Sequence, residues 1–236
     1  MKLRLLLISV ITAINIVACQ HKQQAPISTI DSTLQVNATS ILEEKLSEIN
    51  AQSGQVIVME VQSGQIKALV GLTRKDSANY QSCENFSVWQ STGLMHPISL
   101  LAALETGKVK LSDKVDTGNG IYQVQGRELK DHNWHRGGYG ELTVQEGLAA
   151  SSNIAIYKTM EKAFGNNPQT FFDLLTNMSY GKPDSINGIA SLQPYKITEK
   201  NITWNCIGYE QLISPIQVLT FYNAIANNGK MIQPQL

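Results

Sequence analysis

The sequence has little charge and no excess of either sign. Its 236 residues hold 19 Lys and Arg against 19 Asp and Glu, and charged residues make up only 16% of the chain. A nucleic-acid-binding surface needs a basic face, so this balance argues against a nucleic-acid partner. The charges form no long block, which argues against an extended disordered tail. There are no internal repeats, and the 42% hydrophobic content suffices for the core of one domain.

The sequence also offers no apolar run near its start that is long enough to cross a membrane. Residues 5–18 form a run of 14 residues after Lys2 and Arg4, whereas a spanning helix needs about 20. A short apolar run behind basic residues is typical of an export signal. It ends Ile-Val-Ala-Cys, as a bacterial lipoprotein signal does. We expect residues 1–18 to be removed and Cys19 to carry lipid, an ordinary signal peptide being the alternative.

Cysteine is scarce. Besides Cys19, the chain holds only Cys83 and Cys206. Two cysteines of an exported protein can form a disulfide. Their separation in the sequence is large and nothing local brings them together. A disulfide and two buried thiols therefore both remain open.

Patterning predicts an α+β domain over residues 41–236, behind a polar tether over 19–40 that is rich in Gln, Ser and Thr. Apolar residues at helical spacing predict a helix over 41–49. Two β-branched-rich runs over 56–70 flank Ser63-Gly64, a short-turn signal, and predict a hairpin. The rest of the domain is mainly helical.

Start and stop signals place several helices in that body. A helix over 93–106 ends at Gly107, and a short hairpin is expected around 121–129. Either Ser151 or Ser152 can cap a helix that runs to Gly165. Further helices are predicted at the capping box Thr143-Val-Gln-Glu146, around 171–175, and from Ser214-Pro215 to Asn228-Gly229.

Four segments follow one another along the chain: the hairpin 56–70, the helix region 91–105, the Ser-x-Asn motif at Ser151 and Asn153, and the region 207–230. In this order they resemble the penicillin-binding transpeptidases, and their sequences are most similar to the class B enzymes of septal peptidoglycan synthesis. The resemblance implies a partial β-lactamase/transpeptidase-like fold, with an N-terminal hairpin and a mainly helical body. The chain ends at Leu236 before any Lys-Thr/Ser-Gly segment, so later sheet strands are expected to be missing.

The resemblance places a missing nucleophile at the start of the helix over 93–106. In that family a serine opens this helix, and a lysine one turn later, directly before a proline, activates it. Alignment on Pro97 puts Gly93 at the serine position and His96 at the lysine position. The resemblance thus implies lost catalysis, and no catalytic residue is assigned. Ser151 and Asn153 keep a motif that holds substrate in the family, although a helix cap and a loop hydrogen bond would explain them equally.

Three weaker candidates remain. Thr92 and His96 lie one helical turn apart and could pair a hydroxyl with an imidazole. Ser179-Tyr-Gly-Lys182 has Ser-x-x-Lys spacing, but its glycine opposes a helical placement. His132 and His135 beside Asp131 have a spacing seen in metal sites, but they lie in a glycine-rich loop. We predict no metal and no cofactor.

Together these features predict a periplasm-facing lipoprotein of the bacterial cell envelope, linked to peptidoglycan synthesis or septal division and catalytically inactive. Expected partners are the membrane, through the lipid anchor, division-complex proteins, and a peptidoglycan stem peptide or β-lactam bound weakly or non-covalently. Three alternatives stay open. They are a non-catalytic module that binds peptidoglycan or the division complex, an active transpeptidase or β-lactamase relative with an unrecognised nucleophile, and a decayed fragment without a stable fold.

Overall fold

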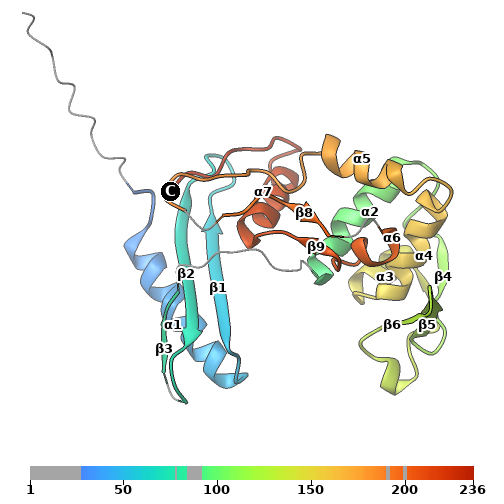
Figure 1. The fold of residues 1–236 in the computed structure, drawn as a ribbon, viewed down its shortest axis with the longest axis horizontal. Coiled ribbons are helices and arrows are strands. Elements are labelled where there is room, and N and C mark those ends of the chain that lie inside the picture. Colours follow the sequence, from blue (N-terminus) through green and yellow to red (C-terminus); the bar gives the residue numbers. More distant parts are fainter. Residues whose placement is uncertain (1–27, 78, 84–91, 190–191, 199–200) are drawn as a thin grey trace, which may run out of the picture.

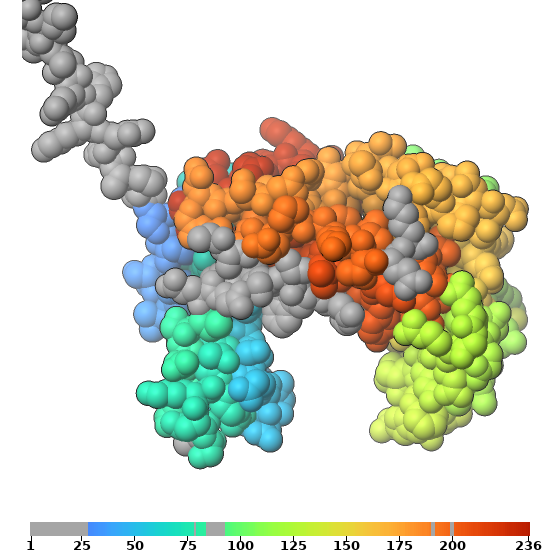
Figure 2. Space-filling model, viewed as in Figure 1, coloured from blue at the N-terminus to red at the C-terminus, as the bar shows by residue number. Residues whose placement is uncertain are grey.

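The computed structural model describes residues 28–236, except 78, 84–91, 190–191 and 199–200. A small sheet with one helix against it lies at one end of the molecule, and a helical body lies at the other (Figure 1). In the space-filling view, the sheet and the hairpin of β5 (Ile121–Val124) and β6 (Arg127–Lys130) project on the same side, with a wide opening between them (Figure 2). The predicted lipid site, Cys19, lies outside the described residues.

The sheet contains the predicted hairpin. Strands β1 (Ser53–Met59) and β2 (Ile66–Arg74) pair antiparallel, and β3 (Tyr80–Ser82) adds to the other edge of β2. Alternate β2 side chains are buried, as expected for a strand with one face on a core. The turn holds Gly64 at a φ of 74°, where a Cβ would lie 2.6 Å from the Gln233 carbonyl oxygen. The hairpin prediction is confirmed.

Helix α1 (Ser32–Glu48) packs on this sheet and begins well before the expected start at residue 41. Its cap explains the difference, because the Asp31 carboxylate accepts hydrogen bonds from the first-turn amides of Thr33 and Leu34. The Gln35 side chain then forms two hydrogen bonds with the backbone of Leu69 on β2. Polar residues assigned to the tether therefore belong to a helix that docks on the sheet.

The helical body encloses the main core. Helices α2 (Met95–Glu105), α4 (Asn153–Phe164), α5 (Gln169–Asn177) and α7 (Pro215–Ala226) all contribute to it or border it. Met95, Ile98 and Phe171 are completely buried there. Burying a side chain of this size contributes about 1.5–3 kcal/mol to the free energy of unfolding. This packing fixes α2 against α4, which matters for the site.

Short elements complete the body, and the predicted helix signals appear where expected. Capping boxes open α3 (Val144–Ala149) at Thr143 and α7 at Ser214, and the hairpin near 121–129 is present. The remaining elements are η1 (Thr92–Leu94), β4 (Lys114–Asp116), β5 (Ile121–Val124), β6 (Arg127–Lys130), η2 (Trp134–Arg136), β7 (Glu141–Thr143), β8 (Lys196–Ile197), α6 (Ile202–Asn205) and β9 (Gln211–Leu212).

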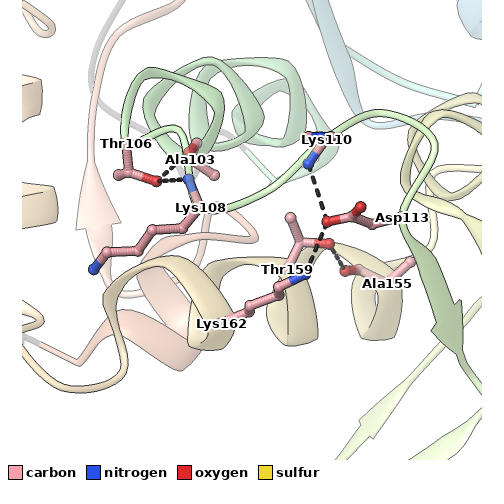
Figure 3. A network of polar contacts seen from close by, with 8 residues as sticks. All are labelled: Ala103, Thr106, Lys108, Lys110, Asp113, Ala155, Thr159 and Lys162. Atoms are coloured by element: carbon pink, nitrogen blue, oxygen red, sulfur yellow. Dashed lines mark hydrogen bonds and ion pairs between the residues drawn. The ribbon is translucent and has the colours of Figure 1, made fainter.

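A polar network ties the loop after α2 to α4 (Figure 3). The Asp113 carboxylate accepts from the Lys162 ammonium on α4 at 2.8 Å and from the Lys110 amide at 3.1 Å. The Lys108 ammonium donates to the Ala163 carbonyl near the end of α4. Because these contacts sit near the surface, each contributes little alone. Together they tie the loop that follows α2 to the C-terminal end of α4.

The two cysteines left open by the sequence are both free thiols. Cys206 is completely buried, which raises the pKa of its thiol, and Cys83 is half-buried.

Within the part of the chain that the structure describes, no helix is both long and apolar enough to cross a membrane.

Candidate functional site

The structure brings together the four positions at which the sequence resembles the transpeptidase motifs. Gly93 lies in η1, and His96 lies in the first turn of α2. Ser151 lies in the turn between α3 and α4, and Asn153 is the first residue of α4. The Ser151 hydroxyl is 3.2 Å from Nδ1 of His96, and a Cβ added to Gly93 would lie 3.3 Å from the same hydroxyl. The serine, lysine and Ser-x-Asn positions therefore converge.

Contacts from the C-terminal part of the chain hold the start of α2. The Tyr222 hydroxyl on α7 donates to the Leu94 carbonyl at 2.8 Å. One turn further on, the buried Ser99 hydroxyl donates to the Cys206 carbonyl at 2.8 Å. The first helical residue, Met95, is completely buried. The backbone that directly follows Gly93 is therefore anchored to the C-terminal part of the chain.

Of the two serines that could cap α4, Ser152 does so. Its hydroxyl accepts from the Ala155 amide at 3.0 Å and donates to the Asp131 carboxylate at 2.8 Å. Ser151 instead adopts a φ of +51°, an uncommon backbone conformation for serine, and is exposed. This conformation leaves the Ser151 hydroxyl directed at His96 rather than at the helix terminus.

Asp131 is the residue whose role sequence reasoning missed. It is 1% exposed, and its carboxylate also accepts from the Ile154 amide at 3.1 Å. Burial raises the pKa of Asp131, and the hydrogen bonds from Ile154 and Ser152 act against that rise. A carboxylate at a helix N-terminus is favoured by the macrodipole. In the sequence its only signal was its neighbouring histidines, which pointed to metal binding instead.

The Asn153 side chain connects the site to the β5–β6 hairpin. Its amide nitrogen donates to the Lys130 carbonyl at 2.8 Å. This is the loop hydrogen bond that the sequence left as one explanation for Asn153. Burial lowers the pKa of His96, and the same Asn153 side chain acts against that shift. Asn153 therefore faces both the hairpin backbone and the imidazole.

His96 is a neutral imidazole at physiological pH. It is only 2% exposed, and burial lowers its pKa below the usual value of 6.5, with Asn153 acting in the opposite direction. Its Nε2 atom has no hydrogen-bond partner among the described residues. A proton on Nε2 makes Nδ1 an acceptor, so that the Ser151 hydroxyl can donate to it.

The weaker candidates are not assembled into sites. The Thr92 side chain lies outside the described residues. Ser179 is exposed at a φ of +58°, and the Lys182 ammonium pairs with Asp184. The His132 ring contacts the Tyr139 hydroxyl, which in turn contacts the Ala150 carbonyl. Over the described ranges no three His, Cys, Asp or Glu side chains are grouped as metal ligands.

A cavity of about 290 Å³ adjoins the site and is lined on one side by Asn153. The Arg127 guanidinium lies 3.9 Å from the centre of the buried Trp204 ring and 3.2 Å from a Glu210 carboxylate oxygen. Tyr209 is exposed at the same cavity. Groups of both signs beside aromatic surface suit a polar peptide better than a purely apolar ligand.

Comparison with known proteins places this arrangement in a family. The model of the penicillin-binding protein transpeptidase domain matches residues 54–236. The chain belongs to this family, as the four segments predicted. It is 24% identical to the probable peptidoglycan D,D-transpeptidase PbpC of Pseudomonas aeruginosa, over 95% of this chain and 41% of that protein. It is 23% identical to the peptidoglycan D,D-transpeptidase FtsI of Escherichia coli, over 85% of this chain and 35% of that protein.

Solved structures confirm the α+β transpeptidase-like fold. The transpeptidase domain of Burkholderia pseudomallei penicillin-binding protein 3 superposes with a TM-score of 0.71 at 23% identity, over 86% of this chain and 59% of that one. A peptidoglycan glycosyltransferase from Burkholderia ambifaria gives a TM-score of 0.71 at 24% identity, over 87% and 63%. The chain thus spans less than half of the two curated relatives named above.

Proposed function

We propose that this chain is a cell-envelope lipoprotein that binds peptidoglycan stem peptides and does not carry out the transpeptidation of its family. One observation carries the proposal: the site is assembled, but glycine occupies the nucleophile position. Gly93 stands where the resemblance places the serine, and a hydroxyl and an imidazole surround its empty side-chain position.

The loss of the family's reaction follows from chemistry. Acyl transfer through a covalent intermediate needs a nucleophilic atom, a base beside it and donors for the developing oxyanion. Gly93 supplies no side-chain atom. His96 is neutral and can accept a proton, but at the matched position there is no hydroxyl to give one. Transpeptidation by the family's route therefore has no first step.

Peptide binding is supported by what the site retains. Asn153 and the adjoining cavity present an amide, an aromatic ring and charged groups of both signs. A short D-amino-acid peptide carries amides and a carboxylate that such groups can bind. The ion pairs beside the cavity are partly exposed, so a ligand can replace them at small cost. We expect weak binding of a stem peptide, and of β-lactams that mimic its end.

The envelope location rests on residues 1–40. An apolar run of 14 residues ending in Ala18 and Cys19 is the length of an export signal, and an acylated cysteine anchors a protein without a spanning helix. Division-complex proteins are proposed as partners because relatives in the family include FtsI, a peptidoglycan D,D-transpeptidase. Fractionation of cells expressing the wild type or Cys19→Ala tests the anchor. Equal membrane recovery of both would exclude it.

The binding proposal is tested by NMR titration of the soluble chain with a stem pentapeptide ending in D-Ala-D-Ala. We expect shifts around Asn153 that are lost in Asn153→Ala and kept in Asn177→Ala, an exposed control at the end of α5. A parallel assay follows D-amino-acid exchange on the peptide by mass spectrometry. The absence of binding, or steady exchange turnover, would contradict the proposed function.

A further inference from the structure

The turn before α4 holds an exposed hydroxyl against a buried imidazole. The Ser151 hydroxyl lies 3.2 Å from Nδ1 of His96, and the backbone of Ser151 is left-handed at a φ of +51°. Uncommon backbone conformations in non-glycine residues concentrate at functional sites. The cap of α4 does not need this hydroxyl, because Ser152 fills that role. Helix capping, the structural role considered for Ser151, is therefore not its role here.

The replacement at position 93 opens space beside the same hydroxyl. Among the described residues, leaving aside its chain neighbours, a Cβ built on Gly93 would have one heavy atom within 4 Å, the Ser151 hydroxyl oxygen at 3.3 Å. Gly93 and Ser151 are both exposed, while His96 behind them is buried. An electrophilic carbon can therefore approach Ser151 from the solvent side, through the volume that a serine at position 93 would occupy.

We propose that Ser151 is a nucleophile that His96 activates, and that it is acylated by D-amino-acid peptides or β-lactams bound in the adjoining cavity that Asn153 lines. The arrangement places a hydroxyl and a base within hydrogen-bond reach of each other, which is the minimal pairing for an activated nucleophile. This inference rests on the proposed function, because the cavity beside Asn153 must first bind the acyl donor. It adds covalent acylation of Ser151 to a protein that lacks the family's own nucleophile.

The step is a nucleophilic acyl substitution. The Ser151 oxygen attacks the carbonyl carbon, and its proton passes to Nδ1 of His96. The new oxygen–carbon bond forms as the carbon–nitrogen bond of the peptide or lactam breaks, and His96 returns the proton to the departing nitrogen. The product is an ester at Ser151. Burial keeps His96 neutral and hence able to accept the proton at neutral pH.

The acylation of Ser151 is tested by intact mass spectrometry of the purified protein after incubation with a penicillin. We expect one adduct, with peptide mapping to Ser151. Ser151→Gly, which suits the left-handed backbone, removes the adduct, and His96→Gln slows its formation about 100-fold or more. Ser179→Ala is the matched control, because Ser179 is also exposed and left-handed but lacks an imidazole contact. Its adduct forms at the wild-type rate.

Melting curves of all variants establish that each is folded. An adduct that persists in Ser151→Gly, or that maps elsewhere, overturns the inference. So does a wild-type chain that binds the stem pentapeptide by NMR yet forms no adduct, although the proposed binding function then stands. A chain that neither binds the pentapeptide nor reacts overturns both. An unchanged rate in folded His96→Gln removes His96 from the mechanism.

Discussion

The starts of α2 and α4 lie side by side in the site but differ in what their polar side chains do. The start of α4 is fully bonded, with the Ser152 hydroxyl, the Asp131 carboxylate and the Asn153 amide all joined to the backbone or to each other. The start of α2 has no side-chain cap, and glycine holds the position of the family's nucleophile. The polar side chains that remain at the start of α4 also stabilise the fold, whereas the serine whose role in the family is nucleophilic attack is replaced by Gly93.

The largest effect should come from removing the anchor of α4. Asp131→Ala deletes two hydrogen bonds to a buried carboxylate, and bonds to charged groups contribute about 1.5–3 kcal/mol each. We expect the free energy of unfolding to fall by about 3 kcal/mol in urea titrations. Asp173→Ala, at an exposed site on α5, is the control and should cost under about 0.5 kcal/mol. Similar losses in both variants would mean that Asp131 is not an anchor.

The two serines should separate next. Ser152→Ala loses the cap of α4 and should cost about 1–2 kcal/mol in the free energy of unfolding. Ser151→Ala leaves the cap intact and should cost about 0.5 kcal/mol or less, as an exposed substitution. Thermal melts of both variants measure the difference. A larger loss for Ser151 than for Ser152 would reverse the roles assigned to them.

These roles mark the limit of what the sequence could predict. The capping boxes at Thr143 and Ser214 and the turn at Gly64 depend on residues close in sequence, and each appeared as expected. The choice between Ser151 and Ser152 did not follow, because it depends on Asp131, which is distant in sequence and close only in the fold. The start of α1 was misplaced for a similar reason, since Gln35 is polar but bonds to β2.

The motif positions converged because the family resemblance already ordered them. The contact between the Ser151 hydroxyl and Nδ1 of His96 was not predicted and appears only in the structure. The sequence had paired His96 with Thr92, its neighbour on the helix, because helical spacing is visible locally. A contact between residues on α2 and at the start of α4 depends on how these helices pack.

The burial of His96 should appear as a pH dependence of stability. Its folded pKa lies below the unfolded value of 6.5, so the unfolded chain binds the proton more readily. Stability is therefore full above about pH 6.5 and falls as pH drops through that value towards the folded pKa. Burial raises the pKa of Asp131, so this residue gives the opposite slope of stability against pH. That slope acts between the folded pKa of Asp131 and its usual value of 3.8. Urea titrations from about pH 8 to about pH 5 should show a slope in the wild type that is flatter in His96→Gln. Equal slopes would contradict a buried, neutral His96.

The smallest change in stability should accompany a sharp change in reactivity. Gly93→Ala reduces the freedom of the unfolded chain, which favours the folded state by about 0.4–1 kcal/mol at a compatible position. The new Cβ would lie 3.3 Å from the Ser151 hydroxyl, which must move slightly, and it would fill the approach to that hydroxyl. We expect an unfolding free energy within about 0.5 kcal/mol of the wild type, and slower adduct formation with penicillin. Ser179→Ala, which lacks an imidazole contact, again serves as the control for adduct formation. If Gly93→Ala reacts as fast as the wild type, the open position is not the route to Ser151.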